Sequence, residues 1–272
     1  MKNSKFDGKV AIITGSSRGI GKAIASALAK QGARIVLNGR DPGRLATAEN
    51  ELRAIHEHVM GVCCDVSTSE GGQRLIDETL SRFKKIDILI CNVGVSMRGN
   101  FAELQPGVFQ AMFLSNVMSA ICTGIPALTH LHMTQGSLVF ISSLVGIRGL
   151  PGLSAYCSSK MSLRAIAESI RIEEAKHQIH VGLVYVGYTE IEEGKEALTA
   201  DGSLLLLKKR EGKGVQSVGS VASAVLKNLS KRKFITVLTP LGKVQSLMQR
   251  LAPWLVERII IKNLHKFEER SS

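Results

Sequence analysis

A tyrosine and a lysine lie four residues apart in the segment Tyr156-Cys-Ser-Ser-Lys160. In a helix, side chains at this spacing lie one turn apart on the same face. A free tyrosine, with a pKa of about 10, is a poor proton donor and acceptor at neutral pH, and a neighbouring ammonium lowers that pKa by favouring the phenolate. The pair therefore suits acid–base chemistry, although two unrelated residues on a helix surface can have the same spacing.

Three glycines near the start of the chain have the spacing of a phosphate-binding turn. Gly15, Gly19 and Gly21 lie within TGSSRGIG (14–21), which follows an apolar run and opens a helical segment. Glycines at these positions let the backbone turn tightly and approach a pyrophosphate, and the helix N-terminus offers it free N–H groups. The motif alone also fits a plain turn, but its position between a first strand and a helix favours dinucleotide binding.

The residues after the second strand bear on which dinucleotide is bound. Dinucleotide folds place an acid there for the adenosine ribose, or a base where a 2′-phosphate must be held. This chain has Asn38 and then Arg40, with Arg18 in the glycine turn as a second cation, and guanidinium groups bind phosphate through charge-assisted hydrogen bonds. Asp41 is the exception, and we expect it to cap the helix that begins at Pro42. The sequence predicts NADP(H) in preference to NAD(H).

Apolar runs and helical segments alternate along the chain. Near-continuous apolar strands between amphipathic helices indicate a parallel sheet buried on both faces, so the predicted fold class is α/β, a Rossmann-like, doubly wound, seven-stranded parallel sheet with helices on both faces. Ligands of such sheets bind beyond the carboxyl ends of the strands. The predicted strands are 10–14, 34–37, 59–63, 86–91, 137–141, 179–185 and 234–239, and the predicted helices are 19–30, 42–56, 69–83, 106–130, 154–176 and 218–230.

Together these motifs resemble the short-chain dehydrogenase/reductase family, in its shorter form with the TGxxxGxG and YxxxK motifs. Matching positions run from Lys9 to about Thr239, which is most of the chain. Each motif is common alone, but here all of them occur in order and on the expected elements. Besides the glycine turn and the Tyr–Lys pair, the matches are Asp65-Val66, Asn92-Val93-Gly94, Asn116 and Ile141-Ser142-Ser143.

The resemblance implies hydride transfer between a nicotinamide and a ketone or secondary alcohol. Tyr156 is then the general acid in reduction and the general base in oxidation. Ser143 stabilises developing charge on the substrate oxygen, and it is selected over Ser142 because the family serine precedes the tyrosine by about a dozen residues. Lys160 holds the nicotinamide ribose and, with the charge of the oxidised nicotinamide, lowers the pKa of Tyr156. Asn116 helps to hold a water that links Lys160 to solvent.

The resemblance also implies a set of cofactor contacts. Asp65 and Val66 match the pair that meets the adenine, Asn92 and Gly94 match the turn that lets the cofactor lie close, and Thr189 is matched to the nicotinamide amide. The predicted cofactor-binding residues are Gly15, Ser17, Arg18, Gly19, Ile20, Gly21, Arg40, Asp65, Val66, Asn92, Gly94, Tyr156, Lys160 and Thr189.

Two places depart from the family pattern. Cys91 replaces the first asparagine of Asn-Asn-Ala-Gly, a position that often steadies the central strands, so we expect a cost in stability more than in activity. After the sixth strand, Val186-Gly187 replaces the usual Pro-Gly, and a commonly found threonine falls at Ile191, which has no hydroxyl group.

The composition limits other classes of function. A net charge of +12 suits nucleic acid, an anionic membrane or an anionic cofactor, but 4% aromatic residues and no recognisable binding module argue against nucleic acid. Five cysteines indicate reduced thiols in a cytoplasmic protein. We expect no secretory signal, and no apolar run approaches the roughly 20 residues of a membrane span. The seven histidines lack metal-ligand spacing, so no metal site is expected.

Residues 188–216 occupy the position where this family covers its substrate. The segment is long and punctuated by glycines, as expected of a mobile lid. Its leucines, 204–207, would roof an apolar pocket or pack on the preceding helix, and we expect the basic residues 208–210 to be a solvated turn. No converging polar set indicates a particular sugar, acid or nucleotide, so the expected substrate is a lipophilic ketone or secondary alcohol.

Residues 241–272 extend beyond the Rossmann-fold domain, which we place at 1–240. A basic amphipathic helix with a tryptophan, Trp254, can lie in a membrane interface. We favour the alternative that its apolar face packs on the body or on a second subunit. The resemblance implies a homodimer or homotetramer. The apolar residues at helical spacing are Val244, Leu247, Met248, Leu251, Leu255 and Ile259.

A rival hypothesis is a catalytically idle protein of the same fold, which binds NADP(H) and acts as a sensor or at a membrane surface. A sensor needs no proton relay. The complete set of Asn116, Ser143, Tyr156 and Lys160 therefore favours an enzyme.

Overall fold

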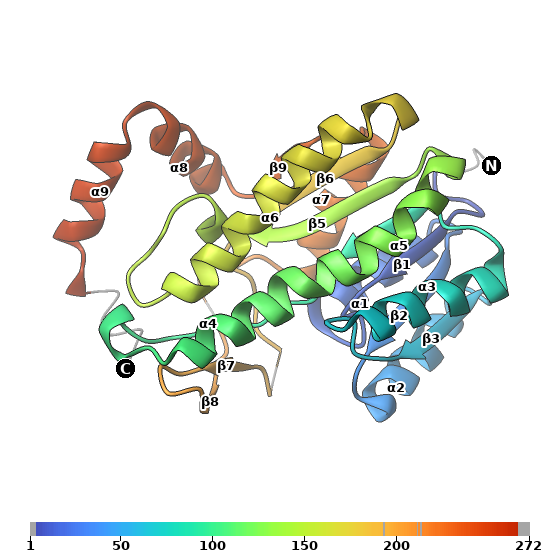
Figure 1. Cartoon of the computed structure of the whole chain (residues 1–272), viewed down its shortest axis with the longest axis horizontal. Helices are drawn as coiled ribbons and strands as arrows, with labels where there is room; N and C mark the ends of the chain where they lie inside the picture. The colour runs from blue at the N-terminus through green and yellow to red at the C-terminus, as the bar shows by residue number, and fades with distance from the viewer. Residues whose placement is uncertain (1–3, 193, 211, 213, 266–272) are drawn as a thin grey trace.

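A seven-stranded parallel sheet organises the protein (Figure 1). The structure, a computed structural model, describes residues 4–192, 194–210, 212 and 214–265. The strand order is β3-β2-β1-β4-β5-β6-β9, which confirms the predicted fold class. The strands are β1 (Val10–Ile13), β2 (Arg34–Gly39), β3 (Val59–Cys63), β4 (Ile88–Cys91), β5 (Ser137–Ser143), β6 (His180–Val186) and β9 (Ile235–Val237).

Helices cover both faces of the sheet. Successive strand residues point to opposite faces, so Ala11 and Ile13 of β1 join one apolar cluster while Val10 and Ile12 join the other. The first cluster is covered by α1 (Gly19–Ala29), α2 (Pro42–Arg53) and α7 (Val218–Ser230), and the second by α3 (Ser69–Phe83), α5 (Ser119–Thr134) and α6 (Ser154–Glu173).

The chain changes direction across the sheet between β1 and β4. These two strands pair in parallel although β2 and β3 lie between them in the sequence. Thr14, just past β1, joins them because its hydroxyl oxygen accepts a hydrogen bond from the backbone N–H of Asn92 at 3.0 Å. Crevices at such switch points are where doubly wound sheets bind ligands, and the predicted site residues are found at this edge.

One long helical rod crosses the second face. It consists of α4 (Pro106–Phe113), a π-helical turn (Leu114–Met118) and α5, so it ends four residues later than predicted. By length and hydropathy the rod could cross a membrane, which qualifies the expectation that no segment could do so, but half of its most apolar window is buried inside the protein. We interpret it as a core helix.

The segment expected to be a lid forms a hairpin. Strands β7 (Glu196–Leu198) and β8 (Leu204–Leu206) pair antiparallel. The hairpin is fixed to the loop after β4, because the N–H of Arg98 donates to the carbonyl of Leu198 at 2.7 Å. Elsewhere α6 is shorter than predicted and is followed by a 3-10 turn, Ala175–His177.

The C-terminal extension is two helices where one was predicted. They are α8 (Pro240–Leu251) and α9 (Pro253–Lys262), and the break at Ala252 follows from Pro253, which disfavours helical backbone in the residue before it. Arg148 attaches them to the body by donating hydrogen bonds to the Gln249 side chain at 2.7 Å and the Pro253 carbonyl at 3.2 Å.

Most of the large apolar side chains of α8 and α9 are exposed to solvent. Leu251 is 69% exposed and Trp254 58%, and Figure 1 shows both helices standing away from the sheet. For the described residues of the extension, the packing that we expected on the body or on a second subunit therefore stays a prediction.

Candidate active site

Tyr156 and Ser143 meet at the carboxyl edge of the sheet. Tyr156 lies in the first turn of α6 and Ser143 is the last residue of β5. The Ser143 hydroxyl lies close enough to the Tyr156 phenol to act on its pKa. The preceding serine, Ser142, points elsewhere: its hydroxyl donates to the backbone carbonyl of Lys160 at 3.1 Å. The alternation of side chains along a strand thus separates the two serines, and the structure places Ser143 beside the tyrosine.

Burial raises the pKa of Tyr156 above its usual value. The hydrogen bond from Ser143 and the positive charges of Arg98 and Arg210 act in the opposite direction without outweighing burial. The sequence-based expectation was a lowered pKa, caused by Lys160 and by the charge of an oxidised nicotinamide. In the protein without a nicotinamide, the pKa of Tyr156 is raised instead of lowered, because the apolar packing around the phenol disfavours the phenolate.

Lys160 is deeply buried for a lysine, with only 5% of its surface exposed. Its ammonium donates a hydrogen bond to the carbonyl of Ile141 at 3.1 Å. Burial, followed by the charge of Lys195, lowers the pKa of Lys160 to about 8. The group therefore remains mostly protonated at neutral pH, and it lies near the end of β5, against the backbone of Ile141.

Asn116 sits in the π-helical turn, where the wider winding turns its side chain away from the regular helix register. Its carboxamide oxygen accepts from the N–H of Val95 at 2.8 Å, and its nitrogen donates to the Val95 carbonyl at 3.0 Å and to the Ser159 hydroxyl at 2.9 Å. Asn116 thus joins the long helix, the loop after β4 and α6. Such π-turns are frequent at functional sites.

Gly94 is the point at which this loop approaches Asn116 and Lys160. A Cβ atom at Gly94 would lie 2.9 Å from both the Asn116 carboxamide oxygen and the Lys160 ammonium, so a larger residue would displace one of them. Asn92 holds the same loop against the glycine turn, because its side-chain nitrogen donates to the carbonyls of Thr14 and Gly15 at 3.0 Å each.

The glycine turn has the form that a pyrophosphate requires. Gly15 and Gly19 adopt φ values of +60° and +57°, which favour glycine. In the described chain, Arg18 at the N-cap of α1 makes no side-chain hydrogen bond to the helix, whereas α2 and α3 are capped by Asp41 and Thr68. The first N–H groups of α1 are therefore available to an anion.

The residues flanking these glycines contribute in different ways. A Cβ atom at Gly21 would lie 2.4 Å from the Gly15 carbonyl, so the turn and α1 pack together only with glycine there. Ser17 lies against Gly39 at the end of β2. Ile20 packs its side chain on the core, so only its backbone N–H is left to face a phosphate. We conclude that this turn fits a dinucleotide cofactor.

The structure does not bring together the two arginines predicted to hold a 2′-phosphate. Arg40 forms an ion pair with Asp65 at 3.5 Å, and Arg18 donates to the carbonyl of Gly194 in the lid segment at 3.4 Å. As expected, Asp41 caps α2, since its carboxylate accepts from the N–H of Arg44 at 3.0 Å. Both arginines flank the same turn, but each has a different partner.

The remaining predicted cofactor residues surround this region. Burial acts to raise the pKa of Asp65, but hydrogen bonds from Ser67 and the nearby Arg40 hold that pKa below its usual value. The next residue, Val66, is buried. Thr189 is also buried, and its hydroxyl donates to the Gly187 carbonyl at 3.1 Å.

Three cations near the catalytic residues were missed or undervalued by the sequence analysis. Lys195 lies close enough to lower the pKa of Lys160, and Arg98 and Arg210 both act on Tyr156. Arg210 was expected in a solvated turn, but its guanidinium lies 4.1 Å from the ring centroid of Tyr188. The only signal in the sequence was their location in the two loops that border the site.

Comparison with known proteins agrees with this geometry. Residues 9–201 match the model of the short chain dehydrogenase family. The chain is 31% identical over 273 residues to dehydrogenase/reductase SDR family member 7B of Bos taurus, covering 97% of this chain and 83% of the relative. It is 28% identical to L-fucose dehydrogenase of Bos taurus (86% and 87% covered) and 29% identical to 3-dehydrosphinganine reductase of Danio rerio (90% and 75% covered).

Solved structures share the fold. A short-chain dehydrogenase/reductase from Burkholderia phymatum in complex with NAD superposes with a TM-score of 0.81 at 24% identity, covering 92% of this chain and 96% of the other. An alcohol dehydrogenase from Thermococcus sibiricus complexed with 5-hydroxy-NADP gives a TM-score of 0.75 at 28% identity, with 85% and 96% covered.

The chain belongs to the short-chain dehydrogenase/reductase family. It is accordingly an oxidoreductase that acts on CH–OH and C=O groups of small molecules with a nicotinamide cofactor.

Proposed function

We propose that the protein is an NADP(H)-dependent oxidoreductase that interconverts a lipophilic ketone and the corresponding secondary alcohol, with Tyr156 as general acid and base. The observation on which this depends most is that Ser143 lies within reach of the Tyr156 phenol, with the buried Lys160 one turn further along the same helix. A protein that only sensed the cofactor would have no need of this arrangement, so we do not favour the idle alternative.

The chemistry follows from what each side chain can do. A bound nicotinamide would supply or accept the hydride. In reduction, the Tyr156 phenol gives its proton to the carbonyl oxygen of the substrate, and in oxidation it takes that proton back. Ser143 donates a hydrogen bond to the same oxygen as negative charge develops. Lys160 places a positive charge behind Tyr156 and stabilises the phenolate left after proton transfer.

The preference for NADP(H) is supported by the end of β2. Strands that select NAD(H) end there in an acid, whereas here Asn38 is buried and its side-chain nitrogen donates to the carbonyls of Val62 and Cys64 at 3.2 Å each. Arg40 is 74% exposed at the side chain and pairs with Asp65. A 2′-phosphate could therefore compete for its guanidinium without a buried contact being broken.

The lipophilic substrate class is supported by the surroundings of Tyr156. The tyrosine packs against an apolar cluster formed by Met97, Val108, Met112 and Ala155. The similarity to 3-dehydrosphinganine reductase agrees with a long-chain ketone. The similarity to L-fucose dehydrogenase keeps a sugar as the second candidate.

We also propose that this is a cytoplasmic protein whose α8 and α9 contact an anionic membrane surface. The basic residues Lys243, Arg250, Arg258 and Lys262 alternate with exposed apolar side chains on these helices, which is the composition of an interfacial helix.

We further propose a homodimer or homotetramer. This is supported by exposed apolar residues on the neighbouring helices α5 and α6, such as Ile125 at 70% and Ile172 at 75%.

The experiment that tests the proposed function is a cofactor titration followed by a substrate screen. NADPH and NADH are titrated into the protein while Trp254 fluorescence and cofactor emission are recorded. We expect tighter binding of NADPH, followed by NADPH consumption with long-chain ketones. Tighter binding of NADH would contradict the cofactor preference, and turnover of sugars alone would contradict the substrate class.

A further inference from the structure

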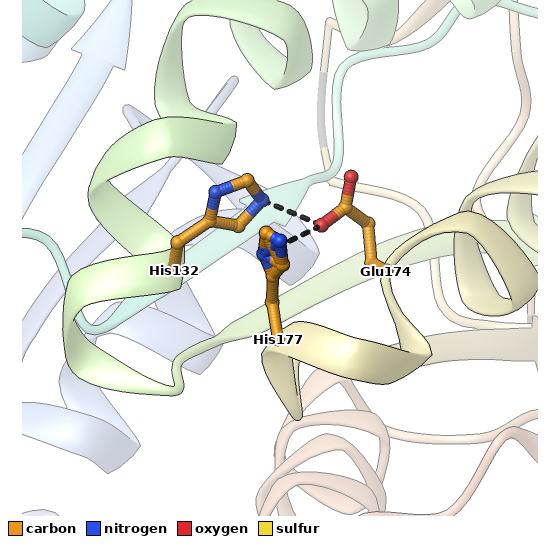
Figure 2. Close-up of side chains that lie close together, drawn as sticks. All are labelled: His132, Glu174 and His177. Atoms are coloured by element: carbon orange, nitrogen blue, oxygen red, sulfur yellow. Dashed lines mark hydrogen bonds and ion pairs between the residues drawn. The ribbon is translucent and has the colours of Figure 1, made fainter.

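Three metal-ligating side chains converge far from the active site. His132, Glu174 and His177 meet where α5 and α6 end, as Figure 2 shows. Their ligand atoms all lie within 4.8 Å of one another. Neither hydride transfer nor cofactor binding uses these residues, since Glu174 follows Lys160 by fourteen positions along α6, roughly 20 Å at the rise of a helix.

The topology of the sheet brings these residues together. His132 is in the last turn of α5, which leads into β5, and His177 ends the 3-10 turn that leads into β6. Because β5 and β6 are neighbouring parallel strands with Ser137 opposite His180, the segments entering them lie side by side. The cluster is therefore at the amino end of these strands, opposite the catalytic edge.

Local geometry then aligns the donors. Residues three apart in a 3-10 turn lie above one another on the same side, and the N–H of His177 donates to the carbonyl of Glu174 at 3.0 Å. One carboxylate oxygen of Glu174 lies 2.5 Å from Nε2 of His132 and 3.9 Å from Nδ1 of His177. The two imidazole rings are 3.9 Å apart between centroids. Both rings thus present a nitrogen to the same oxygen.

An ordinary ion pair accounts for only part of this arrangement. The Glu174 carboxylate oxygen is in close contact with His132, whereas the His177 nitrogen that faces the same oxygen is 3.9 Å away from it. Two neutral imidazoles and a carboxylate are instead a common ligand set for zinc and related ions, and a divalent cation satisfies all three together.

We propose that His132, Glu174 and His177 form a binding site for one divalent transition-metal ion of the Zn²⁺ class, separate from the proposed function. Ligands about 2.0 Å from a tetrahedral zinc lie about 3.3 Å from one another. The 2.5 Å contact between His132 and Glu174 must lengthen, and the 3.9 Å separation between His177 and Glu174 must shorten. Each change is about an ångström or less, which rotation of the side chains allows. Water would complete the coordination.

The side chains are placed to admit an ion from solvent. Their exposed fractions are 27% for His132, 12% for Glu174 and 30% for His177, so the site is neither sealed nor fully hydrated. A bound ion would tie the end of α5 to the turn after α6. Its role is to stabilise the folded chain, since an ion bound only by the native state raises stability by mass action.

The test uses untagged full-length protein treated with a chelator and then titrated with ZnCl₂, NiCl₂ or CoCl₂ by calorimetry. We expect one ion per chain, an absorption band of coordinated cobalt, and a rise in Tm of about 5 °C or more at saturation. Mg²⁺ and Ca²⁺, which prefer oxygen ligands, should not compete. Absence of binding by all three transition metals would refute the site.

Variants locate the ion. His177→Gln keeps the His132–Glu174 pair and should fold, yet we expect its zinc affinity to fall at least tenfold, and His132→Gln to do the same. The matched control is the double variant His56→Gln/His58→Gln, which removes another neighbouring pair of rings, 5.5 Å apart, and should retain full affinity. Unchanged affinity in His177→Gln, or loss in the control, would overturn the assignment.

Discussion

Two adjacent serines at the end of β5 have opposite orientations, and this gives the sharpest test at the scale of the residue. Ser143 lies within reach of the Tyr156 phenol, whereas the Ser142 hydroxyl donates to the backbone carbonyl of Lys160. We expect Ser143→Ala to lower kcat about 10²- to 10³-fold, as loss of an oxyanion donor does. Ser142→Ala should keep most of its activity and lose about 1 kcal/mol of unfolding free energy. Equal kinetic losses would contradict the separate roles.

Removal of the phenol hydroxyl addresses the proton transfer itself. Tyr156→Phe should reduce kcat about 10²- to 10⁴-fold, the usual contribution of a general acid. Its Kd for NADPH, measured by fluorescence, should be nearly unchanged, because the ring and the apolar cluster around it remain. If cofactor binding disappeared together with turnover, Tyr156 would be a structural residue.

The buried ammonium of Lys160 predicts how stability depends on pH. Its pKa is lowered to about 8 by burial, whereas in the unfolded chain it titrates near its usual value. Between these values the unfolded chain binds more protons, so stability rises with pH there. The full shift corresponds to about 3 kcal/mol.

We therefore expect Lys160→Met to be more stable than the parent protein below pH 8, with an advantage that shrinks as the pH rises toward 10.5. Urea unfolding at a series of pH values measures this difference. Lys208→Met, at an exposed position, controls for the general effect of pH. A constant difference between parent and Lys160→Met across the series would show that the ammonium is not destabilised by burial.

At the scale of the element, α1 and β2 define the cofactor end. The uncapped N-terminus of α1 faces the turn formed by Gly15 and Gly19, and Arg40 follows β2. If the proposed NADP(H) preference is right, the pyrophosphate and the 2′-phosphate are recognised by different elements, and a change at Arg40 should affect one cofactor only.

Arg40→Ala should weaken NADPH binding about 10- to 100-fold, because the variant loses one or two hydrogen bonds to a charged group. NADH binding should stay within about twofold. Arg44→Ala is the matched control, because Arg44 lies one turn further along and pairs with Asp41. Titration of both cofactors measures the ratio, and equal weakening of NADH and NADPH would contradict a 2′-phosphate contact.

At the scale of the whole molecule, the exposed apolar surface of α8 and α9 needs a partner. We expect the protein to sediment with vesicles containing phosphatidylserine, less so as salt is raised. Leu247→Glu/Leu251→Glu should abolish sedimentation, and Ile55→Glu, an exposed apolar position elsewhere, should not. Failure to bind vesicles, with a lower oligomer mass in the double variant, would identify a second copy as the partner.

Much of the fold was predictable because its signals are local. Apolar runs mark the strands, glycines mark the first turn, and Asp41 stands at a helix start, so the parallel sheet followed from these patterns. The choice of Tyr156 and Lys160 followed from their spacing on one helix together with the family resemblance. The break before Pro253 was also present in the sequence, but the apolar spacing across it suggested one continuous helix.

The sequence by itself determined the fold class, the family and the residue types available at the site. Only the tertiary structure decided which of them meet: Arg210 near Tyr156, Arg40 with Asp65 instead of Arg18, and His132 with Glu174, which is 42 positions away. The physical reason is that periodicity and motif spacing act over a few residues, whereas these contacts depend on strand order and on the loops that the sheet brings together.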